Sequence, residues 1–127
     1  MGRNLEVLVL DDEAIVCDRL KDYLEKKNIS VETYTVSSAA LNRLREKAFD
    51  VVVTDLKMDG PTGMDVLRAV KKGGRSTEVI MITGYASIET SHEAEAVGAF
   101  KFIAKPFKMS EVHKLIEKAA KKAHKGK

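Results

Sequence analysis

Residues 51–55 read Val-Val-Val-Thr-Asp, a short β-branched run that ends in an acid. A strand that is apolar on both faces is typical of a parallel sheet with helices packed against both sides. Similar short runs recur along the chain, although one of them alternates in polarity and so suits the edge of a sheet. The sequence predicts five strands, near residues 5–10, 31–35 (the alternating run), 50–54, 78–82 and 101–104.

Longer amphipathic segments separate these runs and are predicted to be helices, near residues 13–27, 38–47, 63–72, 87–97 and from 110 onward. Alternating strands and helices favour an α/β fold with a parallel sheet. Right-handed crossovers leave few topologies, and we predict the strand order 2-1-3-4-5. The expected fold is therefore a flavodoxin-like, doubly wound (βα)5 domain with three layers.

Side-chain spacing gives two finer predictions about the helices. In the first helix Ile15, Leu20 and Leu24 lie near helical spacing and are expected to face the core. Ser37 or Ser38 is expected to cap the start of the second helix, because serine accepts hydrogen bonds from the first helical N–H groups.

The composition is that of one globular domain, expected to span residues 1–127. No apolar stretch approaches the roughly 20 residues that cross a bilayer, and no secretory leader is visible, so a cytoplasmic protein without membrane contact is expected. Cys17 is the single cysteine, which rules out an internal disulfide.

The net charge of +3 comes from the end of the chain. Residues 118–127 carry five lysines and no acid, whereas the rest carries 17 basic and 19 acidic residues. This basic tail has no aromatic residue on which a base could stack. We interpret it as the solvated, fraying end of the last helix, and expect no direct nucleic-acid binding by this domain.

Five polar residues stand just after the predicted apolar strands: Asp11, Asp12, Asp55, Thr83 and Lys105. The carboxyl ends of parallel strands meet at one edge of a sheet, so these side chains are expected to converge there. Carboxylate oxygens suit Mg²⁺, which also binds phosphate oxygens. An acidic pair alone would more simply cap a helix, but the third carboxylate favours a metal and phosphoryl site.

Four segments together carry a family resemblance. They are Val-Leu-Asp-Asp-Glu at 9–13, Val-Thr-Asp-Leu-Lys-Met at 53–58, Ile-Thr-Gly-Tyr-Ala at 82–86 and Ala-Lys-Pro-Phe at 104–107. In this order and spacing the chain resembles the receiver domain of bacterial two-component response regulators, over essentially its whole length. The last two segments are similar to receivers fused to transcriptional activators of the nitrogen-regulation type.

The resemblance implies a phosphoacceptor. Asp55 would take a phosphoryl group from a phosphohistidine of a sensor histidine kinase. Mg²⁺, with Mn²⁺ as a substitute, would be held by Asp11, Asp12, Asp55 and the backbone carbonyl of Lys57. The chain would act as a switch with self-catalysed phosphotransfer and slow autodephosphorylation, rather than as a conventional enzyme.

The resemblance also implies roles for residues around the phosphoryl group. Thr83 and Lys105 would contact it, and a cis peptide bond is expected before Pro106. Thr83 and Phe102 would then switch the face formed by the expected helix at 87–97, the strand at 101–104 and the helix from 110 onward. That face would control an output domain or partner protein, and a homodimer through it is a further alternative.

Three positions depart from or extend the common pattern. Asp59 stands where many receivers have proline after the residue matching Met58. Lys57 and Tyr85 follow Asp55 and Thr83 by two residues, where the family lines the path of hydrolytic water. We expect these two side chains to tune dephosphorylation.

Two other functions remain open from the sequence. A receiver-like module could bind partners without any phosphate, although none of the five polar residues is lost. An Asp-nucleophile phosphatase of the haloacid-dehalogenase type is the enzymatic alternative. It places a general acid two residues after its nucleophile, and here that position is Lys57.

Overall fold

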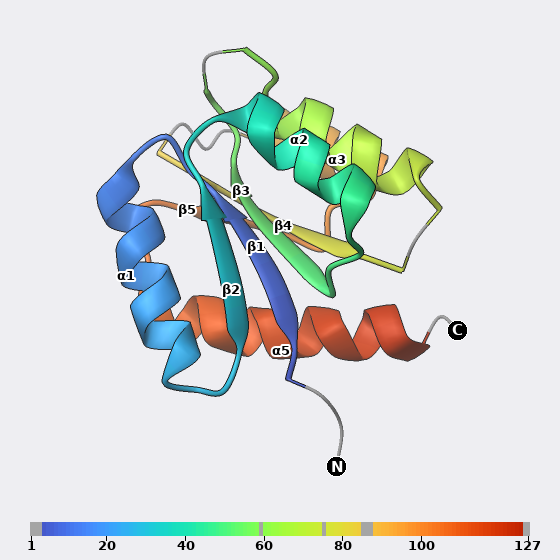
Figure 1. Ribbon diagram of the computed structural model, residues 1–127. Coiled ribbons are helices and arrows are strands. Elements are labelled where there is room, and N and C mark those ends of the chain that lie inside the picture. Colours follow the sequence, from blue (N-terminus) through green and yellow to red (C-terminus); the bar gives the residue numbers. More distant parts are fainter. Residues whose placement is uncertain (1–3, 59, 75, 85–87, 126–127) are drawn as a thin grey trace.

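The computed structural model describes residues 4–58, 60–74, 76–84 and 88–125. Five parallel strands form one sheet in the order β2-β1-β3-β4-β5, which confirms the predicted topology (Figure 1). The strands are β1 (Glu6–Leu10), β2 (Ser30–Tyr34), β3 (Val51–Asp55), β4 (Glu78–Thr83) and β5 (Lys101–Ala104).

Five helices alternate with the strands: α1 (Ala14–Glu25), α2 (Ser37–Glu46), α3 (Gly63–Lys72), α4 (Ile88–Val97) and α5 (Met109–Lys125). Helices α1 and α5 cover one face of the sheet, and α2, α3 and α4 cover the other (Figure 1). The result is the expected three-layer, doubly wound fold. Among the described helices, none combines the length and the apolar character needed to cross a membrane.

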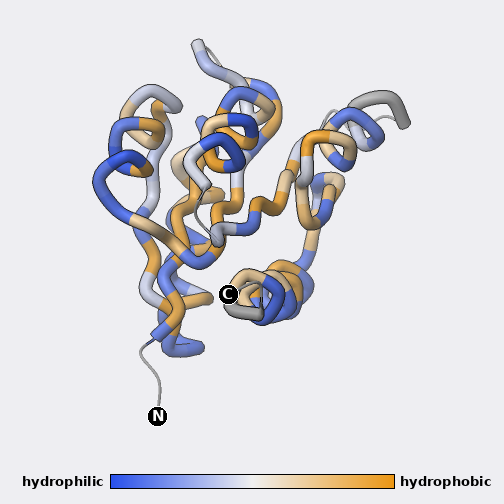
Figure 2. The backbone as a smooth tube through the Cα atoms, turned by 90° about the vertical axis from the view of Figure 1, so that its right-hand side faces the viewer, coloured by the Kyte–Doolittle hydropathy of each residue, from blue (hydrophilic) through white to orange (hydrophobic). Residues whose placement is uncertain are grey.

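Alternate side chains of the strands supply two separate cores. Val7 and Val9 of β1 pack with α1 and α5, whereas Leu8 and Leu10 pack with the helices on the opposite face. All five residues of β3 are buried. The inner strands are therefore among the most hydrophobic parts of the chain and lie between the helical layers (Figure 2). Burial on both faces explains why the sequences of β1, β3 and β4 are largely apolar.

The finer predictions about the helices were wrong for Ile15 and for the cap of the second helix, whereas Leu20 and Leu24 are buried as expected. Ile15 has 57% of its surface exposed, because the buried stripe of α1 is formed by Cys17, Leu20 and Leu24. Ile15 lies about 200° around the helix from Cys17, at 100° per residue. The second helix begins at Ser37 itself, with Val36 in the capping position and no side-chain cap, so neither serine serves as the N-cap.

A half-buried ion pair between Glu32 and Arg43 links the edge strand β2 to α2. The carboxylate of Glu32 accepts hydrogen bonds from Arg43 Nε at 2.9 Å and Nη2 at 3.0 Å, and from the Tyr34 hydroxyl at 3.0 Å. These contacts, led by the Arg43 hydrogen bonds, outweigh burial and lower the pKa of Glu32 from 4.5 to about 2. β2 is an edge strand, and this pairing helps to attach it to the helical layer.

Glu32→Gln is expected to weaken the dependence of stability on acid pH. Because the pKa of Glu32 is lower in the folded state, its contribution is complete above pH 4.5 and is lost as the pH falls toward 2. Urea unfolding of both proteins across this range should show their free energies of unfolding converging at low pH. Glu46→Gln is the control, because Glu46 contacts the same arginine but is 66% exposed. An equal acid dependence in Glu32→Gln and the parent would contradict the assignment.

Candidate functional site

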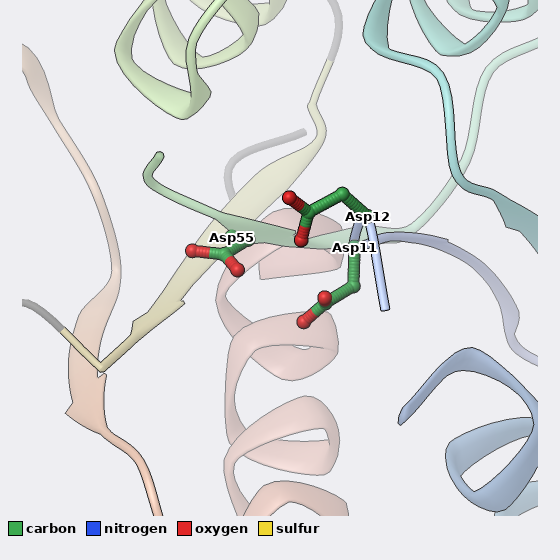
Figure 3. Close-up of side chains that lie close together, drawn as sticks. All are labelled: Asp11, Asp12 and Asp55. Atoms are coloured by element: carbon green, nitrogen blue, oxygen red, sulfur yellow. The ribbon is translucent and has the colours of Figure 1, made fainter. Parts of the chain in front are cut away.

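Three carboxylates converge where β1 and β3 end. Asp11 and Asp12 follow β1 directly, and Asp55 is the last residue of β3, the strand paired with β1. One ligand oxygen from each carboxylate lies within 4.8 Å of the others, and the three side chains lie close together (Figure 3). The chain leaves β1 toward β2 on one side and returns to β3 on the other. The cluster therefore occupies the topological switch point, where ligands bind in such sheets.

Lys105 is the counter-ion of this cluster. Its Nζ lies 2.9 Å from Asp11 Oδ2, 3.1 Å from Asp55 Oδ2 and 2.9 Å from Glu13 Oε1. Burial alone would lower the pKa of Lys105, but the hydrogen bonds that its ammonium donates to the carboxylates of Glu13, Asp11 and Asp55 outweigh burial and raise the pKa. Lys105 is thus a fixed cation within a largely buried acidic site.

The position of Lys105 follows from the pairing of the last two strands. Thr83 at the end of β4 pairs with Ala104 of β5, and the Lys105 N–H donates to the Thr83 carbonyl at 2.8 Å. The Lys105–Pro106 peptide bond is cis, in agreement with the expectation for Pro106.

Asp11 is the most enclosed of the three acids and has no exposed surface. Burial raises its pKa, against the opposing effects of the Glu13 N–H, which donates to Oδ1 at 2.9 Å, and of Lys105. Asp12 is exposed. Asp55 is 6% exposed, and its Oδ1 accepts the Lys57 N–H at 3.2 Å. Asp11 and Asp55 are therefore buried, whereas Asp12 is open to solvent.

The structure places most of the remaining sequence candidates. Thr83 is buried at the end of β4, and Phe102 is half-buried in β5 against the core of α3 and α4. The side chain of Lys57 is exposed beside the site. Tyr85 lies outside the described residues, as does Asp59.

The contact of Glu13 with Lys105 was not predicted from the sequence. The Glu13 carboxylate binds Lys105 across 92 residues of sequence. The available signal was the third acid that directly follows the Asp11–Asp12 pair. A residue at the start of a helix is ordinarily interpreted as a helix-terminus acid, so the long-range partner was not apparent.

The fold and the site together define a doubly wound α/β protein with three carboxylates and one lysine clustered at its switch point. The model of the response regulator receiver domain family matches residues 7–117, so this chain belongs to that family.

Relatives of known sequence agree with this family. The chain is 31% identical over 121 residues to the transcriptional regulatory protein ZraR of Escherichia coli, a match that covers 95% of the chain and 27% of ZraR. It is also 31% identical over 117 residues to the response regulator protein TodT of Pseudomonas putida, covering 92% of the chain and 52% of TodT. The chain thus spans about a quarter and about half of these two relatives.

Solved structures show the same fold. A response regulator receiver domain protein from Clostridium thermocellum superimposes with a TM-score of 0.86 at 33% identity, covering 92% of this chain and 94% of that one. A CheY-like receiver domain protein from Methanospirillum hungatei superimposes with a TM-score of 0.92 at 26% identity, covering 98% and 99%.

Proposed function

We propose that the chain accepts a phosphoryl group on Asp55 from a phosphohistidine of a sensor histidine kinase, with residues 1–127 acting as one receiver unit. The observation that carries the proposal is the position of the Asp55 carboxylate. It ends a fully buried strand, is still 6% exposed, contacts the ammonium of Lys105 and lies beside two further carboxylates. A carboxylate so placed can act as a nucleophile.

The residues present fit a divalent cation. Three carboxylates and one ammonium leave the cluster with excess negative charge, in a site where Asp11 is buried and its pKa is raised by that burial. In this proposal Asp11, Asp12, Asp55 and the backbone carbonyl of Lys57 hold Mg²⁺, or Mn²⁺ in its place. When bound, the cation would supply positive charge to the phosphoryl oxygens.

The transfer itself uses a small number of groups. An Asp55 carboxylate oxygen forms the new bond to phosphorus as the bond from phosphorus to the donor imidazole nitrogen breaks. The bonding electron pair leaves with the imidazole. The ammonium of Lys105 neutralises charge on the transferred group, and the Thr83 hydroxyl donates a hydrogen bond to it.

The proposed output is a change on the face formed by α4, β5 and α5. Thr83 and Phe102 lie on the neighbouring strands β4 and β5, so a movement at the phosphoryl site can reach this face. An output domain, a partner protein or a second copy would bind there. A solved relative with 30% identity is described as the beryllofluoride-activated NtrC4 receiver domain dimer. Lys57 and Tyr85 would tune the lifetime of the phosphoryl group.

Incubation with a small phosphodonor tests the proposal. With Mg²⁺ the intact protein is expected to gain the mass of one phosphoryl group, and chelation of the metal should prevent the gain. An acyl phosphate is also expected to be cleaved by neutral hydroxylamine, unlike a phosphoserine. A protein that shows no gain with Mg²⁺ and donor would contradict the proposed function.

Lys105→Met is expected to increase the affinity for Mg²⁺ by about tenfold, because the ammonium now occupies the same carboxylates that the cation would bind. Titration with Mg²⁺ followed by nuclear magnetic resonance measures the change. Lys101→Met is the control, because this substitution removes the same charge at an exposed position of β5. Unchanged or weaker affinity in Lys105→Met would show that the lysine does not compete with the metal.

A further inference from the structure

A cavity of about 380 Å³ lies between the C-terminal halves of α2 and α3. Its walls include Leu41 and Leu44 of α2 and Val70 of α3, with Phe49 buried at its base. Phe49 and Thr77 lie before the starts of β3 and β4, so the cavity is at the opposite edge of the sheet from Asp55. Its volume falls in the range of roughly 300–1,000 Å³ found for small-molecule sites.

The inner surface of this cavity is apolar. Thr77 is its buried polar side chain, and its hydroxyl already donates to the Phe49 carbonyl at 2.6 Å. The interior therefore suits a hydrocarbon chain or ring rather than a group that needs hydrogen bonds.

The mouth of the cavity is positively charged. Arg45, Lys47 and Lys72 line it, and no acid is among the lining residues. Lys47 is paired with Glu6 and Glu32, but Arg45 and Lys72 are exposed, and within the described part of the chain Lys72 has no hydrogen-bond or ion-pair partner. The ends of α2 and α3 bring about half a negative charge each, so the two exposed cations leave the mouth net positive.

We infer that this cavity binds a small amphiphilic carboxylate, with its hydrocarbon part between α2 and α3 and its acid group at Arg45 and Lys72. An arginine can bind a carboxylate through two parallel hydrogen bonds, and a lysine adds a second point charge. The inference does not depend on phosphorylation, because the cavity shares no residue with the acidic site.

Octanoate is a suitable probe. Titration of the isotopically labelled protein is expected to give saturable chemical-shift changes centred on the amides of Ala48, Phe49, Val70 and Gly73. The neutral analogue 1-octanol should bind more weakly, because it cannot use the charged mouth. Phosphodonor and Mg²⁺ are left out, so failure of the proposed function would not affect this measurement.

The double variant Arg45→Glu/Lys72→Glu is expected to weaken octanoate binding about tenfold, because it replaces two cations at the mouth with anions that repel the carboxylate. Lys114→Glu/Lys118→Glu on α5 changes the net charge equally and should leave binding unchanged. Absent saturation, equal binding by the Arg45/Lys72 variant, or shifts centred elsewhere would overturn the inference. The inference would also be overturned if the protein bound an acidic peptide at this cavity but did not bind octanoate.

Discussion

Asp55→Asn is expected to abolish the gain of a phosphoryl group altogether. The amide has no carboxylate oxygen to attack phosphorus. Its carbonyl oxygen can still accept the hydrogen bond that the Lys57 N–H donates to Asp55 at 3.2 Å. Little change in fold is therefore expected, and circular dichroism of the variant checks this. Intact mass after treatment with phosphodonor and Mg²⁺ measures the effect.

A matched substitution separates loss of the nucleophile from loss of charge. Asp18→Asn removes one carboxylate from an exposed position in the middle of α1, away from the cluster. It should take up the phosphoryl group as the parent does. Equal uptake by Asp55→Asn and the parent would show that another residue is the acceptor.

Gly63→Ala is expected to destabilise the protein by about 3 kcal/mol, because overpacking at a buried backbone contact costs that much. Gly63 is the first residue of α3, and its N–H donates to the Leu56 carbonyl at 2.9 Å. An added Cβ would lie 2.2 Å from the backbone oxygen of Asp55 and 2.9 Å from Leu56 Cα. These are backbone atoms, so the clash can be relieved only by moving the phosphoacceptor strand or the helix.

Gly73→Ala is the control for this prediction. Gly73 ends the same helix with a right-handed backbone conformation, and its added Cβ would lie 3.5 Å from its nearest neighbours, an ordinary contact. That variant should be neutral or stabilised by roughly 0.5 kcal/mol. Urea unfolding measures both, and a Gly63→Ala protein as stable as Gly73→Ala would contradict the packing described at the end of β3.

The topology could be predicted because β1, β3 and β4 are buried on both faces. Such strands appear in the sequence as apolar runs, such as Val-Val-Val at 51–53, and can be recognised without knowing how the chain packs. Their carboxyl ends then locate Asp11, Asp12 and Asp55 at one edge without any coordinates. The prediction of convergence at the switch point is confirmed by the clustering of the three carboxylates.

Other features depend on long-range packing and were not predictable in the same way. Whether Ile15 faces the core depends on which stripe of α1 meets the sheet, and a single residue near helical spacing does not decide that. The contact between Glu13 and Lys105 joins the start of α1 to the end of β5, which only the assembled sheet brings together. The cavity between α2 and α3 likewise arises from two helices that are distant from the acidic motifs.

The most direct test is to locate the phosphoryl group on the chain. After incubation with phosphodonor and Mg²⁺, reduction with labelled borohydride converts an acyl phosphate to an alcohol and leaves the label at the residue that carried it. Peptide mass spectrometry is expected to place that label on Asp55. Label on Asp11, Asp12 or another acid, or no label on a protein that has gained the phosphoryl mass, would contradict the proposed role of Asp55.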